Sequence, residues 1–130
     1  MSTIFTKIID GEIPSYKIAE NENFYAFLDI NPLAKGHTLV IPKKEINYIF
    51  DIQDDLLSEM MVFAKKVAKA IEKSISCERI GVTVIGLEVP HAHIHLIPIN
   101  SITDMDFSKA KLSFSKEEFE KITESIVSNL

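Results

Sequence analysis

The feature that most constrains this chain is an alternating stretch at residues 89–98, which holds three of the four histidines of the sequence. His91, His93 and His95 are separated by single apolar residues. Side chains of a β-strand alternate between its two faces, so a strand here places the three imidazoles in a row, with neighbouring Cα atoms about 7 Å apart. A helix would turn successive members by about 200° and scatter the rings. The stretch therefore predicts a strand whose histidine face is the candidate site.

Length and composition narrow the class of protein. With 130 residues, of which 46% are hydrophobic and 25% charged, the chain matches one soluble globular domain. Its net charge of -5 disfavours a broad basic surface for nucleic acid. The lone Cys77 cannot form an intramolecular disulfide. Asp10 and Glu12 lie where a signal peptide would be apolar, and no stretch approaches membrane-spanning length. We therefore expect a cytoplasmic protein that binds neither nucleic acid nor a membrane.

Short apolar runs separated by turn residues predict four more strands before the histidine stretch. These strands are expected at residues 16–19, 24–30, 37–41 and 80–85. On the histidine strand, Ala92, Ile94 and Leu96 go to the face opposite the histidines. A short helical turn is expected at residues 4–9.

Two longer helices are also predicted. From about residue 51 to residue 74, apolar side chains recur at spacings of three and four, which is typical of an amphipathic helix on a core. The stripe consists of Leu56, Met60, Phe63, Val67 and Ile71. A capping box of Ser115 and Glu118 predicts the start of a last helix. Its apolar face must dock on the same domain or on a partner subunit, and consists of Phe119, Ile122, Ile126 and Leu130.

Three interpretations of the histidine row compete. In the first, the histidines are polar residues of a half-exposed strand, which three histidines at period two disfavour. In the second, they bind a metal, because neutral imidazole is a good zinc ligand. Tetrahedral ligation needs nitrogens that converge about 2.0–2.1 Å from one point, and three rings in a row diverge. A ligand from elsewhere, such as His37 or Glu88, would then be required.

The third interpretation is nucleophilic catalysis on phosphorus. The ordinary histidine pKa near 6.5 leaves one imidazole nitrogen free to attack at neutral pH. A neighbouring histidine can donate to phosphate oxygens or carry a proton to the leaving group. Adjacent imidazoles also disfavour each other's charged form, which helps to keep the nucleophile neutral.

The stretch from His91 to Ile97 resembles the motif of the histidine triad (HIT) family, in which three histidines alternate with apolar residues and two apolar residues follow. Residues 4–14, 26–32 and 36–43 resemble three further blocks of that family, in the family's order. Together these four blocks cover about residues 4–98.

The resemblance implies an α+β fold with an antiparallel five-stranded sheet, a long crossover helix and a C-terminal helix. Residues 1–100 would form the catalytic part, and residues 101–130 a C-terminal extension of the same single domain. The implied activity is that of a nucleotide hydrolase or nucleotidyl transferase acting at the α-phosphate of nucleoside phosphoramidates or dinucleoside polyphosphates. The substrate would be a small purine nucleotide, the assembly a homodimer, and neither a metal nor another cofactor would be needed.

The resemblance also implies roles for the histidines and Asp29. His93 would be the nucleophile that forms a nucleotidyl-histidine intermediate, which water then cleaves. His91 and His95 would orient it and contact phosphate, and His37 would support them, unless His37 is an ordinary strand histidine. Asp29 would accept hydrogen bonds from the ribose hydroxyls, unless it only caps the turn that follows it. An apolar base pocket would be lined by Phe5, Ile8, Phe27 and Ile30, each of which is otherwise core.

The chain departs from the family pattern in the loop before the histidines. Leu87 stands where a Gln is common, and Glu88 where a small hydroxyl residue is common. The usual Asn has no equivalent, Glu45 replaces a frequent histidine, and Ile99 replaces a frequent arginine. Leu87 cannot donate a hydrogen bond to phosphate, which predicts slow turnover, unless it is a core residue. A nucleotide-binding or interaction module with little turnover is therefore the second hypothesis, and a metal-binding protein the third.

Overall fold

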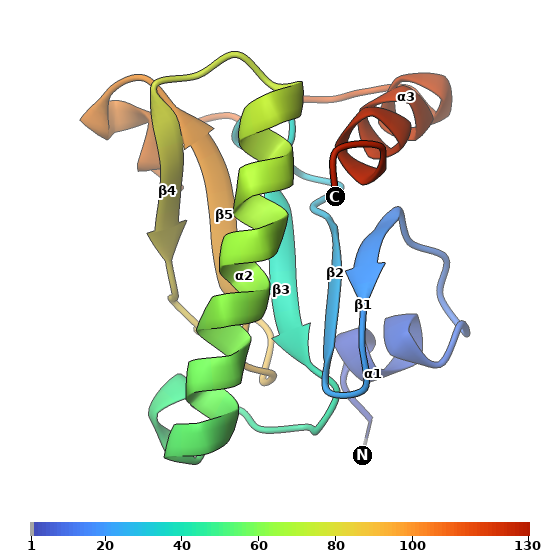
Figure 1. Cartoon of the computed structure of the whole chain (residues 1–130), viewed down its shortest axis with the longest axis vertical. Coiled ribbons are helices and arrows are strands. Elements are labelled where there is room, and N and C mark those ends of the chain that lie inside the picture. Colours follow the sequence, from blue (N-terminus) through green and yellow to red (C-terminus); the bar gives the residue numbers. More distant parts are fainter. Residues whose placement is uncertain (1) are drawn as a thin grey trace.

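The computed structural model describes residues 2–130 and has an α+β fold (Figure 1). Its elements are α1 (Ile4–Ile9), β1 (Lys17–Glu20), β2 (Phe24–Leu28), β3 (Thr38–Pro42), the 3₁₀ turn η1 (Ile49–Asp51), α2 (Asp54–Ser74), β4 (Arg79–Thr83), β5 (Ile94–Ile99), the 3₁₀ turn η2 (Ile102–Met105) and α3 (Lys116–Val127). The five strands form one antiparallel sheet in the order β1-β2-β3-β5-β4. This confirms the predicted fold class.

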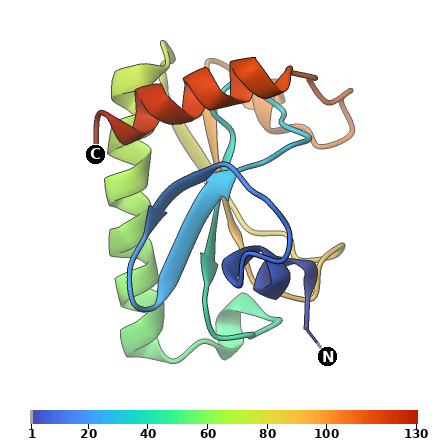
Figure 2. The same ribbon diagram turned by 90° about the vertical axis from the view of Figure 1, so that its right-hand side faces the viewer.

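Helices cover both faces of the sheet. α2 lies along one face and α1 lies against the other, as the edge-on view shows (Figure 2). Between α2 and the sheet is the main core, to which Ala92, Ile94 and Leu96 contribute, as predicted for the face opposite the histidines. A second cluster lies on the α1 side and contains Phe5, Ile8, Tyr25, Phe27, Leu39 and Ile41. The histidines therefore face the α1 side of the sheet.

α2 is amphipathic, and its buried residues follow the predicted stripe: Met60, Phe63, Ala64, Val67, Ala70 and Ile71. Asp54 and Asp55 in its first turn and Lys73 in its last turn complement the helix dipole. Among the helices formed by residues 2–130, none is long and apolar enough to cross a membrane.

α3 docks on its own domain, which settles the alternative that the sequence left open. The predicted capping box is present, with the Ser115 hydroxyl accepting from Glu118 N–H and Glu118 accepting from Ser115 N–H. The apolar side chains that α3 buries against α2 and β1 are Phe119, Ile122 and Ile126. Leu130, also expected on this face, is exposed.

The bounds of the first four strands differ from the prediction by one or two residues, and two other boundaries differ by more. The long helix begins at Asp54, because residues 49–51 form a separate turn and Ile52 is extended. β5 begins at Ile94, so that two of the three histidines precede the strand. Ala92 N–H donates to the carbonyl of Ile46 (2.7 Å), in the loop after β3, instead of continuing the ladder with β3.

Candidate active site

The four histidines come together where β3 and β5 lie side by side. His91 and His93 lie just before β5, His95 is the second residue of β5, and His37 directly precedes β3. Leu39 of β3 pairs with His95, which brings the start of β3 next to the histidine stretch. All four side chains are buried, which contradicts the interpretation as polar residues of a half-exposed strand.

His91 is held by both ring nitrogens. Nε2 lies 2.8 Å from the carbonyl oxygen of Pro42, so Nε2 carries the proton and donates it. Nδ1 lies 2.8 Å from the Thr3 hydroxyl and therefore accepts. Thr3 is also the N-cap of α1, where its oxygen accepts from Thr6 N–H (3.1 Å). The start of α1 thus fixes the orientation of His91.

His93 has one nitrogen engaged with the main chain. Its Nδ1 lies 2.8 Å from the carbonyl oxygen of His91, and a carbonyl can only accept, so Nδ1 carries the proton. In a neutral imidazole the lone pair is then on Nε2. The ring lies edge-on to Phe5, with centroids 5.0 Å apart. Main-chain geometry therefore makes Nε2 the nitrogen that carries the lone pair of a neutral His93 ring.

His37 and His95 form a directed hydrogen-bonded pair. Leu33 N–H donates to His37 Nδ1 (3.0 Å), so the proton of neutral His37 is on Nε2. His37 Nε2 lies 3.0 Å from His95 Nδ1 and donates to it. The proton of neutral His95 is therefore on its own Nε2. The two hydrogen bonds run from Leu33 through His37 to His95, and they fix the direction of the His95 Nε2–H group. The ring of His95 lies next to that of His93, with centroids 4.9 Å apart.

Burial keeps these histidines neutral. Desolvation, reinforced by neighbouring imidazoles, lowers the pKa of His37 to about 3 and that of His95 to about 4. It also lowers the pKa of His91. At neutral pH all three are therefore uncharged, as the hydrogen-bond pattern requires.

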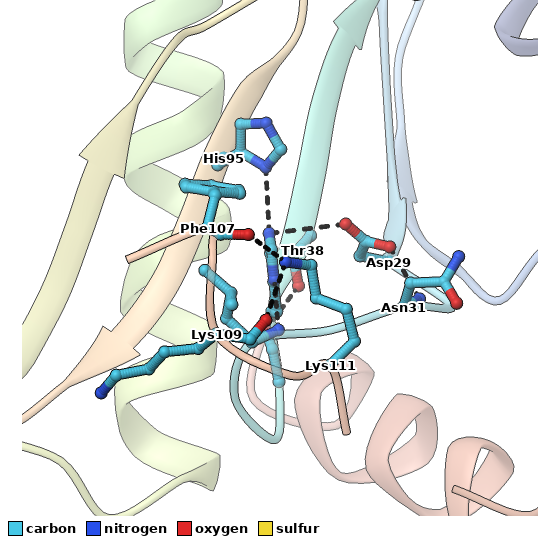
Figure 3. Close-up of polar contacts among 10 residues, drawn as sticks. Asp29, Asn31, Thr38, His95, Phe107, Lys109 and Lys111 are labelled. Carbon is cyan, nitrogen blue, oxygen red and sulfur yellow. Dashed lines mark hydrogen bonds and ion pairs between the residues drawn. The ribbon is translucent and has the colours of Figure 1, made fainter. Parts of the chain in front are cut away.

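Asp29 lies beside the histidine pair, just after β2. Its Oδ1 accepts from Asn31 N–H (2.8 Å), which is the turn-capping contact considered from the sequence. Its Oδ2 lies 3.6 Å from His37 Nε2 (Figure 3). Burial raises the pKa of the Asp29 carboxyl. Both oxygens keep lone pairs for a further donor.

The residues predicted to line a base pocket divide into two groups. Phe5, Ile8 and Phe27 lie together in the cluster on the α1 side, and the Phe5 ring contacts both Phe27 (5.6 Å between centroids) and His93. Ile30 is outside that cluster and is 63% exposed. The structure therefore groups three of the four residues, and Phe5 connects this group to the histidines.

The loop between β4 and the histidines is open to solvent. Leu87 is 89% exposed, which contradicts the alternative that it belongs to the core. Gly86 before it has φ of +74°, a conformation that favours glycine. Glu88 is also exposed, and its charge is close enough to act on Asp29.

Asp29, His37 and His95 each offer an atom to a cluster spanning less than 4.8 Å, which suggests a metal site by distance alone. The hydrogen bonds oppose this reading. Leu33 N–H occupies Nδ1 of His37 and leaves a proton on Nε2, whereas a ligating nitrogen must be unprotonated. The arrangement fits a chain of hydrogen bonds better than a metal centre.

Three residues near the site were not found from the sequence. Thr3 contacts His91 across 88 positions, and nothing in a helix N-cap indicates such a partner. Phe107 packs on His95, and Lys111 lies beside it (Figure 3). Both belong to a polar stretch without periodicity.

The departure from the family pattern at Glu45 has a local explanation. The Glu45 carboxylate accepts from Thr3 N–H (2.6 Å) and from the Thr6 hydroxyl (2.9 Å).

Comparisons with known proteins identify the family of this chain. The HIT domain family model matches residues 10–102. An uncharacterized HIT-like protein of Borreliella burgdorferi is 36% identical, and the match covers 98% of this chain and 97% of that protein. An adenosine 5′-monophosphoramidase of Schizosaccharomyces pombe is 35% identical, and the match covers 100% of this chain and 99% of that protein. The crystal structure of a Hit-like protein from Bartonella henselae matches with a TM-score of 0.85 at 32% identity. This match covers 99% of this chain and 96% of that protein.

Fold, histidine constellation and family match thus define the same class of protein. The chain belongs to the HIT family, as its sequence motif indicated.

Proposed function

We propose that this protein is a nucleotide hydrolase, or nucleotidyl transferase, that acts at the α-phosphate of a nucleoside phosphoramidate or a dinucleoside polyphosphate. The observation that carries the proposal is the 2.8 Å contact between His93 Nδ1 and the carbonyl of His91, which leaves Nε2 as a free nucleophile. The phosphoramidase name of the fission-yeast relative supports a phosphoramidate as one substrate.

The reaction has two displacements at phosphorus. His93 Nε2 forms a bond to the α-phosphorus while the bond from phosphorus to the leaving group breaks, and the leaving group keeps the bonding pair. Water then attacks the nucleotidyl-histidine, and its hydroxyl remains on the phosphate. One proton of that water balances the proton taken up by the leaving group, and neutral His93 is restored. The overall change is hydrolysis, and no metal or redox cofactor is needed to balance it.

The neighbouring histidines support this chemistry in different ways. His95 directs its Nε2–H group towards the place where charge develops, and a donor there stabilises the transition state. His91 acts mainly through its main chain, because its carbonyl fixes the His93 tautomer. His37 fixes the tautomer of His95.

Asp29 and the aromatic cluster would bind the nucleoside. A carboxylate accepts two hydroxyl donors well, and both Asp29 oxygens retain lone pairs beside the histidine pair. Phe5, Ile8 and Phe27 would form the floor on which a purine base packs, while exposed Ile30 would cover its outer side. We therefore assign the substrate to the purine nucleotides.

The open loop favours slow turnover, and it keeps a binding module as the second candidate. Leu87 offers no hydrogen bond where the family commonly has an amide, and the nearby Glu88 carboxylate repels phosphate. Both effects weaken the chemical step more than recognition of the nucleoside.

We further propose that the protein is a homodimer that pairs through β4 and α2. β4 is an edge strand, and unpaired edges need cover. A hollow of about 460 Å³ runs between the two elements, lined by Met61 and Val62 of α2 and by Ile80 and Val82 of β4. Val62 is 69% exposed and Val82 is 50% exposed. The α3 face, considered from the sequence as a contributor, is already buried within the chain.

Incubation with adenosine phosphoramidate and with diadenosine polyphosphates, followed by quantification of AMP, tests the proposed activity. We expect slow but catalytic release of AMP from at least one of them. Nucleotide binding without AMP release would instead establish the binding module.

A further inference from the structure

The segment of residues 103–112 lies beyond the part matched by the family model, which ends at residue 102. It is attached to the site from both sides. Met105 packs so closely on Gly81 of β4 that a Cβ atom there would lie 2.6 Å from its sulfur. Leu112 N–H donates to the carbonyl of Pro32 (2.8 Å), in the loop that leads to His37. The segment therefore spans the sheet beside the histidine pair.

Phe107 is the residue of this segment that contacts the histidines. Its ring lies edge-on to His95, with centroids 4.8 Å apart and an interplanar angle of 69°. The same ring lies edge-on to His37, with centroids 6.2 Å apart and an interplanar angle of 78°. The side chains of His37 and His95 are 1% and 7% exposed. The Phe107 ring packs beside that of His95 (Figure 3) and contacts both imidazoles.

Lys111 holds the turn that presents Phe107. Its ammonium donates to the carbonyl oxygens of Phe107 (2.5 Å) and Lys109 (3.2 Å). The same Nζ lies 5.7 Å from the centroid of the Phe107 ring, within the range of a cation–π contact. Lys109, by contrast, contributes main-chain groups to this turn: its carbonyl accepts from Lys111, and its N–H donates to the carbonyl of Asp106 (3.2 Å).

We propose that Phe107 is a positioning residue of the active site, whose ring excludes water from the His37–His95 hydrogen bond and thereby fixes the direction of the His95 Nε2–H group. Lys111 is the residue that keeps Phe107 in place. The kinetic consequence rests on the proposed function, whereas the effect on the two imidazoles does not.

The groups that face the pair decide what happens when the ring is removed. They are Asp29 after β2, His93 before β5 and Lys111 of the segment itself. Water admitted beside the pair solvates the imidazolium form, and the Asp29 carboxylate then stabilises it further. A charged His95 has protons on both nitrogens, so its Nδ1 no longer accepts from His37. The ring orientation is then lost.

Nuclear magnetic resonance titration of the histidine Cε1–H signals tests this without any substrate. In Phe107→Ala the pKa of His95 should rise by about one unit or more relative to wild type. Phe107→Leu retains most of the apolar cover and should shift the pKa of His95 much less. Lys111→Met should raise the pKa of His95 in the same direction, because the cover loosens when the turn loses the two hydrogen bonds of the Lys111 ammonium.

Lys109→Met is the matched control, since it removes the same charge from the same segment without removing a hydrogen bond. Equal shifts in the two lysine variants, or unchanged His95 titration in both Phe107→Ala and Lys111→Met, would overturn the proposal. If Phe107→Ala does not fold, the comparison of Phe107→Leu and Lys111→Met with Lys109→Met decides.

The kinetic test follows the pH dependence of AMP release. The acid limb should move to higher pH in Phe107→Ala and Lys111→Met and remain in place in Lys109→Met. An acid limb unchanged in all variants would overturn the positioning role. If the wild type releases no AMP at all, the proposed function is wrong. The titration still decides whether Phe107 excludes water from the His37–His95 pair.

Discussion

The Nδ1 atom of His93 lies 2.8 Å from the backbone carbonyl oxygen of His91, so the path of the main chain determines which nitrogen of a neutral His93 carries the lone pair. This contact exists because the chain leaves the regular ladder before Ile94. His91 is in turn fixed by Pro42 on one side and by Thr3 on the other. The nitrogen proposed to react is thus held through main-chain geometry and the start of α1.

Replacing Leu87 by Gln should raise kcat about tenfold. A restored amide can face charge on the phosphate oxygens, although the full oxyanion-donor factor of about 10²–10³ is not expected from a loop not built to hold it. Because Leu87 is 89% exposed, the melting temperature should not change. Leu87→Met, which changes the side chain without adding a donor, is the control. An unchanged single-turnover rate, or an equal rise in both variants, would show that the donor comes from elsewhere.

Replacing Asp29 by Ala should weaken nucleotide binding by about tenfold to 100-fold, because a charge-assisted hydrogen bond to the ribose is lost. Asp29→Asn, which retains an acceptor for Asn31 N–H, separates this effect from the loss of the turn cap. Isothermal titration with ribo and 2′,3′-dideoxy nucleotides measures it. Equal affinity of the wild type for both forms would contradict the ribose role.

The sequence predicted the sheet and the face of the histidine strand well, because both depend on local apolar alternation. Ala92, Ile94 and Leu96 lie in the main core on the α2 side, as the period of two required. The start of β5 was wrong, because it depends on a hydrogen bond between Ala92 and Ile46, in a distant loop. The predicted start of α2 was about three residues early, because Asp51 ends a separate 3₁₀ turn and Ile52 is extended.

The histidine cluster could be predicted, but its hydrogen-bond directions could not. Leu33 N–H and the His91 carbonyl decide the tautomers, and main-chain groups carry no sequence signal. Phe107 was missed because it lies in a polar segment with no periodicity, and only the fold brings it to His95. The roles assigned to Asp29 and the base-pocket residues remain predictions.

Acid should destabilise the fold through the histidine pair. The folded-state pKa values of His37 and His95 are about 3 and about 4, below the ordinary value of 6.5. Between pH 6.5 and these folded-state values, the unfolded chain therefore binds more protons than the folded protein. The stabilisation of the fold by the neutral pair is complete above pH 6.5 and is lost as the pH falls towards 4 and 3. We expect the melting temperature to fall by about 4 °C or more between pH 7.5 and 5.

Comparison with His37→Gln isolates this contribution from that of the carboxylates, which titrate in the same direction. The variant should show a smaller dependence of melting temperature on pH. An equal dependence in both proteins would contradict the assignment to the pair.

Light scattering at micromolar concentration should show a dimer, and Val62→Glu should convert it to a monomer by placing a charge in the α2–β4 hollow. Val127→Glu, at a 42% exposed valine of α3, provides the control and should remain dimeric. A monomeric wild type, or a Val62→Glu dimer of unchanged stability, would contradict this interface.

The most direct test of the whole account is mass spectrometry of the protein after a single turnover, quenched by denaturation at alkaline pH, where a phosphorus–nitrogen bond to histidine survives. We predict one nucleotidyl group on His93 in the wild type, formed equally after treatment with a chelator. We predict no adduct on His93→Ala, whose turnover should fall by about 10³-fold or more while nucleotide binding survives. Catalytic AMP release without any adduct, or near wild-type turnover by His93→Ala, would contradict the account.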